Sequence, residues 1–195
     1  TITYHGIFVR AEGVLPGDHH VYHGTGPIGL TGMNLSRAAG AGKVIGFDPS
    51  PERREIASNL GFEHVYDPTD RDPIDVVDEV TNGRSADVHL ETAGAVNETY
   101  PVIQETLAEE ANVVHVSNAS NAPAIDTRKY QGASAQLYGT EGHTGQQIYP
   151  RVIRLMSAGR LDNTPIITST YSLSNADEAL EQAAKRVDWK VLINV

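Results

Sequence analysis

Short apolar runs alternate along this chain with longer segments whose apolar residues recur at helical spacing. Such runs are typical of strands buried on both faces of a parallel sheet, and the longer segments are typical of the helices that cover it. The alternation predicts an α/β fold of parallel βαβ units, a Rossmann-type doubly wound sheet of six strands. We expect strands at 19–23, 43–47, within 61–67, at 86–91, 112–116 and 135–139, helices at 6–11, 27–39, 51–57, 74–81 and 96–107, and a polar connection at 122–131.

The pattern changes after residue 142, and the remaining residues are predicted to form an α+β segment. Its expected elements are a helix at 146–158, an extended stretch at 165–173, a helix at 174–185 and a strand at 190–193. We therefore divide the chain into a first domain, residues 1–142, and a C-terminal segment, residues 143–195.

A glycine-rich turn joins the first strand to the first long helix. Gly24, Gly26 and Gly29 supply the spacing G-x-G-x-x-G. In a dinucleotide site, such glycines make the tight turn, let the backbone approach a pyrophosphate, and let the helix pack close to the strand. Pro27 and Ile28 lie inside this turn, and a proline at a helix start loses no hydrogen bond. The alternative is a glycine-rich turn in an unrelated α/β protein.

An acidic residue closes the second strand. Asp48 follows the glycines by about twenty residues, the spacing at which an acid binds the ribose 2′-OH of NAD and repels the 2′-phosphate of NADP. The sequence therefore predicts NAD as the cofactor. Arg53 lies either over the adenine end of that cofactor or in solvent, and the sequence leaves both interpretations open.

Further cofactor contacts are expected where the later strands end, because ligands of open α/β sheets bind outside the carboxyl ends of strands. Glu91, Thr92 and Ala93 lie where the fourth strand ends, and Val116, Ser117 and Asn118 lie where the fifth ends. These residues would act largely through their backbone. Tyr138, on the sixth strand, completes the predicted cofactor site.

Histidines are unusually frequent in the predicted strands. One interpretation of His19, His20 and His23 is a metal or catalytic cluster. The other, which we favour, is that successive side chains of a strand point to opposite faces, so that the three do not converge. The sequence assigns no role to His23, His89 or His115 near the strand ends.

Composition excludes several classes of function. The 195 residues contain no cysteine, which excludes disulfides and thiolate metal sites and is compatible with a reducing cytoplasm. The formal net charge of −10 argues against a non-specific nucleic-acid binder, which needs a basic face. With no apolar run long enough for a membrane span and no signal peptide at the start, we expect a cytoplasmic protein without a membrane partner.

Several short motifs follow one another along the chain. They lie at residues 17–18, 24–29, 38–41, 43–45, 48–49, 83–87, 139–143 and 161–168. In this order the chain resembles the medium-chain dehydrogenases, the zinc-type alcohol and polyol dehydrogenase family. Residues 4–8 and 142–145 are similar to the polyol branch, which includes scyllo-inosose, sorbitol and threonine dehydrogenases.

The resemblance implies a Rossmann domain that holds NAD, with residues 143–195 returning to a catalytic domain that holds zinc and substrate. The reaction would be hydride transfer from a secondary alcohol of a small polyol to NAD⁺, with zinc polarising the alcohol oxygen. The family's zinc ligands lie upstream of what would align with Thr1. We therefore assign no catalytic residue and no metal ligand here, and interpret Glu141 and His143 as surface loop. Taken alone, the chain is expected to bind NAD(H) with little or no dehydrogenase activity.

Two alternatives stay open. One is a zinc-independent quinone reductase relative, a branch that prefers NADPH and against which Asp48 argues. The other is a non-catalytic nucleotide-binding module. A short-chain dehydrogenase is disfavoured because no tyrosine has a lysine four residues later, and a methyltransferase does not account for the C-terminal half. Self-association as a homo-oligomer is expected, because the sixth strand, around Leu137, would be a sheet edge.

Overall fold

The computed structural model describes residues 1–142, 145, 147–185 and 188–195. They form two compact units, Thr1–Leu161 and Asp162–Val195, and each unit has its own sheet. None of the helices in this described part of the chain has the length and apolar character needed to cross a bilayer.

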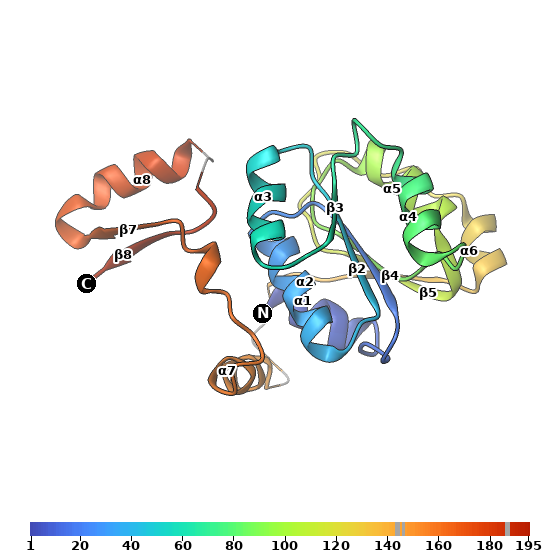
Figure 1. The fold of residues 1–195 in the computed structure, drawn as a ribbon, viewed down its shortest axis with the longest axis horizontal. Coiled ribbons are helices and arrows are strands. Elements are labelled where there is room, and N and C mark those ends of the chain that lie inside the picture. Colours follow the sequence, from blue (N-terminus) through green and yellow to red (C-terminus); the bar gives the residue numbers. More distant parts are fainter. Residues whose placement is uncertain (143–144, 146, 186–187) are drawn as a thin grey trace. The chain divides into compact units, whose positions relative to one another are not determined.

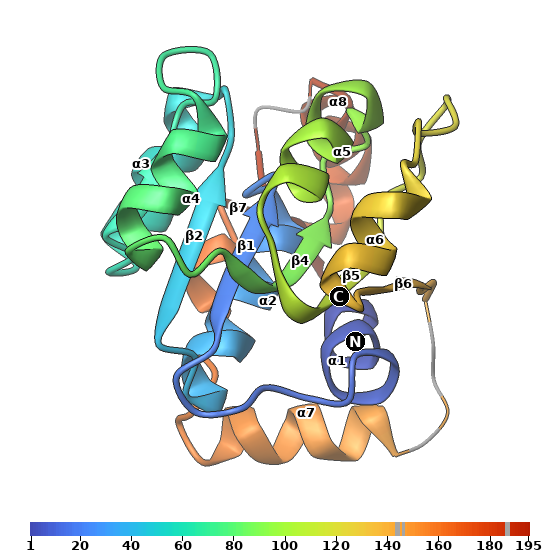
Figure 2. The same ribbon diagram turned by 90° about the vertical axis from the view of Figure 1, so that its right-hand side faces the viewer.

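The first unit is built on the six-stranded parallel sheet that the sequence predicts (Figures 1 and 2). The strand order is β3-β2-β1-β4-β5-β6, and every neighbouring pair is parallel. The strands are β1 (His19–His23), β2 (Lys43–Phe47), β3 (His64–Tyr66), β4 (Ala86–Glu91), β5 (Leu107–His115) and β6 (Gln136–Gly139). The chain moves outward from β1 to β3 and then returns to the other side of β1 with β4, so the strand order reverses between β1 and β4.

Helices cover both faces of this sheet, in keeping with a doubly wound fold. On one face α2 packs against β1, where the Tyr22 hydroxyl lies 2.6 Å from the Ser36 hydroxyl. On the other face, α4 and α5 carry the apolar residues that pack on Val21 and Val113. The helical elements of this unit are α1 (Ile2–His5), the π-helical turn η1 (Gly6–Arg10), α2 (Pro27–Ala39), α3 (Pro51–Asn59), α4 (Pro73–Thr81), α5 (Val96–Glu105), α6 (Thr127–Ala133) and α7 (Ile148–Ser157).

Local sequence explains where these helices begin. Pro27, Pro51 and Pro73 each occupy the first helical position, where the missing N–H costs nothing. Ser50 and Asp72 cap the second and third of these helices, because their side-chain oxygens accept hydrogen bonds from the first-turn backbone. These caps fix the points at which the chain leaves β2 and β3.

Two predictions for the first unit are corrected. The fifth strand begins at Leu107 rather than at residue 112, because a bulge with Glu110 at φ +60° lets the strand pair with β4 over a longer stretch. The expected polar connection at 122–131 contains α6, which Asp126 caps by accepting a hydrogen bond from the Arg128 backbone N–H. The helix has no buried residue, so apolar periodicity gave no signal for it.

The second unit is a small βαβ arrangement. Its strands β7 (Ser169–Ser172) and β8 (Val191–Asn194) pair in parallel, and α8 (Ala176–Ala184) lies between them in the chain. Two 3₁₀ turns, η2 (Thr164–Ile166) and η3 (Leu173–Asn175), shorten the stretch that was expected to be extended. The structure groups α7 with the first unit, and the assignment of residues 143–195 to another domain stays a prediction.

Candidate functional site

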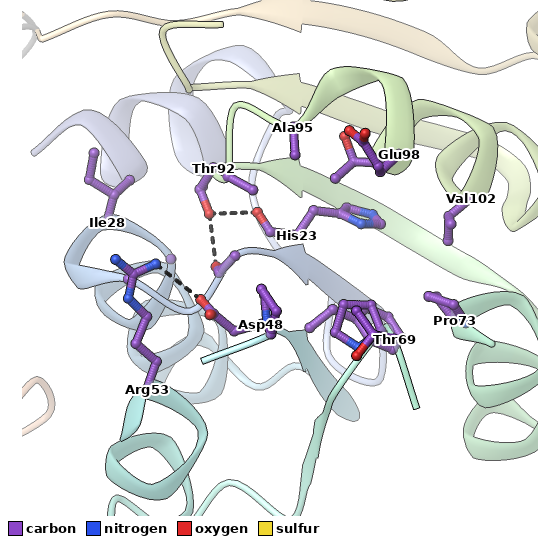
Figure 3. A pocket seen from close by; sticks show the side chains of 18 of the residues that line it. His23, Ile28, Asp48, Arg53, Thr69, Pro73, Thr92, Ala95, Glu98 and Val102 are labelled. Carbon is purple, nitrogen blue, oxygen red and sulfur yellow. Dashed lines mark hydrogen bonds and ion pairs between the residues drawn. The ribbon is translucent and has the colours of Figure 1, made fainter. Parts of the chain in front are cut away.

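A cavity of about 560 Å³ opens where the strand order reverses, at the carboxyl ends of β1, β2 and β4 (Figure 3). Ligands of open α/β sheets bind at such a switch point. The structure brings most of the predicted cofactor residues to the wall of this cavity, namely Gly24, Gly26, Pro27, Ile28, Gly29, Asp48, Arg53, Thr92 and Ala93.

The glycine turn forms one wall of the cavity, and its geometry requires glycine. Gly24 adopts φ +98°, and a Cβ there would lie 3.0 Å from the Ala93 backbone nitrogen. A Cβ on Gly29 would lie 2.0 Å from the Gly24 carbonyl oxygen, a distance that no side chain can occupy. Helix α2 begins here without a side-chain cap, so its first N–H groups are left for water or an anionic ligand.

Asp48 lies beside this turn at the end of β2. Only 1% of the residue is exposed. Its Oδ2 accepts a hydrogen bond from the Thr25 backbone N–H at 2.9 Å, and its Oδ1 accepts one from the Ser50 N–H at 3.0 Å. The Arg53 guanidinium, whose side chain is 42% exposed, stands 3.4 Å from Oδ2 at the cavity rim. The site therefore offers a buried carboxylate with a partly exposed cation next to it.

Thr92 joins the glycine turn to the end of β4. Its hydroxyl lies 2.9 Å from the carbonyl oxygens of both His23 and Gly24, and its backbone N–H donates to His23 O at 2.9 Å. A hydroxyl has one hydrogen, so it shares that hydrogen between the two carbonyls. This side chain acts on the turn rather than on the cavity.

Glu91 belongs to a turn that the sequence predicts to face the cofactor, but sequence reasoning assigned no role to its side chain. It is fully buried, and its Oε1 accepts hydrogen bonds from the backbone N–H groups of Ala93, at 3.1 Å, and Gly94, at 2.9 Å. Its Oε2 accepts a hydrogen bond from the Ser117 hydroxyl. A carboxylate at the last position of a largely buried strand was the available signal. Glu91 fixes the turns that follow β4 and β5.

The remaining predicted residues do not line the cavity. Val116 is 7% exposed, and Ser117 is directed to Glu91. Tyr138 lies on the outer strand β6, where the Arg10 guanidinium stands 5.9 Å from its ring centre. Any role of these three residues in cofactor binding stays a prediction.

The end of the cavity away from the glycine turn was not predicted. Its walls are apolar, with Phe47, Pro73 and Val102 from three different elements. Its polar groups include His23 and Thr99. Pro73 directly precedes the helix expected at 74–81, and Val102 lies inside the helix expected at 96–107, so no motif marked either residue as part of a site.

The histidines of β1 do not converge, as expected from strand geometry. His20 Nδ1 lies 2.8 Å from the Ser36 hydroxyl under α2, whereas His23 faces the opposite layer, with its Nε2 3.3 Å from His89 Nδ1. Nowhere in the described residues do three His, Cys, Asp or Glu side chains gather as metal ligands. His115, at the end of β5, is 3.1 Å from the Tyr100 hydroxyl.

Burial governs the protonation of the central histidine pair. It lowers the pKa of His89 to about 4 and, together with the neighbouring His89, holds the pKa of His23 well below its usual range. Both imidazoles are therefore neutral at pH 7.

The strand order, the glycine turn and the cavity define the first unit as a Rossmann-type α/β domain. The sequence model of the zinc-binding dehydrogenases matches residues 27–158, more than half of the chain. The chain belongs to this family.

Relatives of known name agree with this assignment. The chain is 37% identical over 186 residues to scyllo-inosose 3-dehydrogenase of Thermotoga maritima, covering 93% of this chain and 47% of that protein. It is 30% identical to L-threonine 3-dehydrogenase of Pyrococcus horikoshii, covering 87% of this chain and 49% of that protein. A solved Thermotoga maritima structure, assigned as an alcohol dehydrogenase, superposes with a TM-score of 0.94 at 36% identity and covers 99% of this chain and 50% of that one. The chain thus spans about half the length of these relatives.

Replacing Glu91 tests whether its carboxylate holds the turn that follows β4. In Glu91→Gln, an amide NH₂ replaces one accepting oxygen, so the unfolding free energy should fall by about 1–3 kcal/mol. The amide hydrogens of Ala93 and Gly94 should also exchange faster, as hydrogen-exchange mass spectrometry or NMR can measure. The exposed Glu109→Gln is the matched control and should change stability by no more than about 0.5 kcal/mol. Unchanged exchange at both amides would contradict this role of Glu91.

The neutral histidine pair predicts a pH dependence of stability. Because the folded-state pKa of His89 is depressed to about 4, the unfolded chain binds more protons between pH 6.5 and 4, and acid favours unfolding. His89 alone should remove about 3 kcal/mol of unfolding free energy between pH 7 and pH 4. Urea unfolding of the wild type and of His89→Gln across this range measures the difference. Parallel curves for the two proteins would show that His89 does not titrate in this way.

Proposed function

We propose that this chain is the NAD(H)-binding part of a zinc-dependent alcohol or polyol dehydrogenase. The observation that carries the proposal is the cavity at the strand switch point, with a glycine turn on one wall and the buried carboxylate of Asp48 next to it. A Cβ on Gly24 or Gly29 would clash with neighbouring atoms, so the turn keeps a bare backbone that the phosphates of a ligand can approach. A dinucleotide therefore fits the residues present.

Each part of the cavity has a role in holding this cofactor. The turn Gly24–Gly29 and the free N–H groups of α2 would face the pyrophosphate, whose charge the helix N-terminus favours. Asp48 would accept a hydrogen bond from the adenosine ribose, since its oxygens are already fixed by backbone N–H groups. Arg53 stands where its cation would meet the ribose or the phosphates.

A bound NAD⁺ would supply the hydride acceptor for oxidation of an alcohol, which is chemistry that no side chain supplies. In this proposal the chain binds and orients the cofactor, and zinc belongs to the fuller parent protein. The named activities of the relatives suggest a small polar substrate with a secondary alcohol. We also propose a cytoplasmic homo-oligomer formed through β6, an outer strand on which Leu137 is 41% exposed.

The two alternatives make different demands on the cavity. A quinone reductase relative that used NADPH would place a 2′-phosphate against the Asp48 carboxylate, and the two negative charges would repel each other. Arg53 lies near enough to offset part of that repulsion. A non-catalytic nucleotide-binding module would use the same cavity, and only activity of the parent protein separates it from a dehydrogenase.

Cofactor titration tests the proposed role of Asp48. We expect NADH to bind at least about tenfold more tightly than NADPH, since about 1.4 kcal/mol of repulsion is enough for that factor. Asp48→Asn should reduce this ratio, while Asp177→Asn, an exposed substitution of the same kind on α8, should leave it unchanged. Calorimetry or NADH fluorescence measures both constants. A preference for NADPH would assign the site to the reductase alternative.

Turnover by the chain itself should be absent. With zinc, NAD⁺ and either scyllo-inosose or L-threonine, the chain is expected to reduce no cofactor above background, because the described residues offer no ligand cluster for zinc. Absorbance of NADH at its nicotinamide band follows the reaction. Zinc-dependent turnover would show that the chain carries its own catalytic centre.

A further inference from the structure

His23 occupies the floor of the cavity between the glycine turn and the apolar end. Only 3% of it is exposed, and its ring lies 6.1 Å from that of Phe47 and 5.5 Å from that of His89, centre to centre. Figure 3 shows the imidazole directed away from Ile28 and towards Val102. A ligand that met Asp48 through its ribose would therefore place its base over this ring.

Hydrogen bonds fix which nitrogen of His23 carries the proton. His89 Nε2 lies 3.1 Å from the backbone carbonyl oxygen of Thr106. A carbonyl only accepts, so the neutral His89 carries its hydrogen on Nε2 and leaves Nδ1 as an acceptor. His23 Nε2, 3.3 Å from that Nδ1, must then be the donor. The single proton of neutral His23 is on Nε2, and its Nδ1 keeps a lone pair.

Among the polar groups of the cavity that have no partner in the described residues, two concern the base of a ligand. No described residue hydrogen-bonds to His23 Nδ1, and the Thr99 hydroxyl, on another residue of the cavity wall, is buried without a partner. Phe47, Pro73 and Val102 in the walls around this end offer no side-chain hydrogen bond, and Glu98 adds an exposed carboxylate to the cavity lining. Buried polar groups are rarely left unsatisfied, so these two atoms are suited to a ligand.

We propose that His23 determines which base the site accepts, with Nδ1 receiving a hydrogen bond from an exocyclic amino group of the purine. This inference rests on the proposed function and concerns the base rather than the phosphates or the nicotinamide. Adenine carries an amino donor beside a ring nitrogen that accepts, which complements an imidazole acceptor and a hydroxyl donor. Hypoxanthine replaces the amino group with a carbonyl oxygen, and two lone pairs would then face each other.

The hydrogen bonds from Thr106 through His89 to His23 determine which nitrogen of His23 faces the cavity. With Nε2 held by His89, the His23 ring cannot turn its N–H into the cavity without losing that hydrogen bond and leaving a buried acceptor unpaired. Polar sites built in this way reject analogues that lack the matching group more strongly than apolar pockets do. His89 is accordingly a positioning residue, and His23 is the residue that contacts the base.

Dinucleotides that differ only in the base test this inference. The dissociation constants of NADH and of its hypoxanthine analogue are measured by fluorescence or calorimetry with the whole chain. We expect NADH to bind about 10-fold or more tightly, because one unpaired buried acceptor is enough for that factor. Equal constants, with NADH binding intact, would overturn the inference and leave the proposed function standing. Binding of neither dinucleotide would overturn the proposed function and the inference with it.

Two variants assign the effect to His23. His23→Phe removes the imidazole acceptor and should reduce the base preference to about twofold or less, whereas His23→Gln supplies an N–H for His89 Nδ1 and an amide oxygen as a substitute acceptor and should retain part of the preference. His64→Phe, a substitution on β3 away from this cavity, is the matched control and should retain the preference. Thermal unfolding confirms that each variant is folded. A folded His23→Phe protein that kept the full preference would overturn the assignment.

Discussion

The contact between the Gly24 carbonyl oxygen and Gly29 sets the geometry on which the site depends. A Cβ on Gly29 would stand 2.0 Å from that oxygen, so helix α2 reaches its present distance from β1 only because the side chain is absent. The same turn ends β1 at the sheet centre, where β2 and β4 flank it. Moving α2 outward by one methyl group would shift the wall of the cavity and the first N–H groups of the helix together.

Acidic side chains then hold the loops around this contact. Asp48 binds the backbone of Thr25 and Ser50, and Glu91 binds the backbone that follows β4. Each carboxylate is buried, so its hydrogen bonds are charge-assisted and shielded from water. Asp48 thereby joins the turn after β1 to the loop after β2, and Glu91, through Ser117, joins the turn after β4 to the one after β5. This leaves the cavity open while its walls stay in place.

The sequence predicted the sheet well because its strands and turns obey strong local rules. The apolar runs, the G-x-G-x-x-G turn and Asp48 each depend on neighbours in the chain, and they fixed the strands β1, β2 and β4 and one wall of the cavity. The bulge at Glu110 and the helix α6 were missed, because strand pairing and capping rather than apolar periodicity determine them. The apolar end of the cavity was missed because Phe47, Pro73 and Val102 meet only in the folded chain.

The buried histidines show how a polar group can occupy a parallel sheet without weakening it at neutral pH. A strand covered on both faces usually excludes such groups, since an unpaired polar atom there costs free energy. His89 and His23 are both neutral at pH 7, and the hydrogen bonds that run from Thr106 through His89 to His23 satisfy three of their four nitrogens, all but His23 Nδ1. That last nitrogen lies at the cavity, where a ligand can complete its hydrogen bonding, whereas the buried Nε2 of His20 has no hydrogen bond and lies 4.0 Å from the Asp18 carboxylate. The polarity of the His89–His23 pair is therefore resolved at the site.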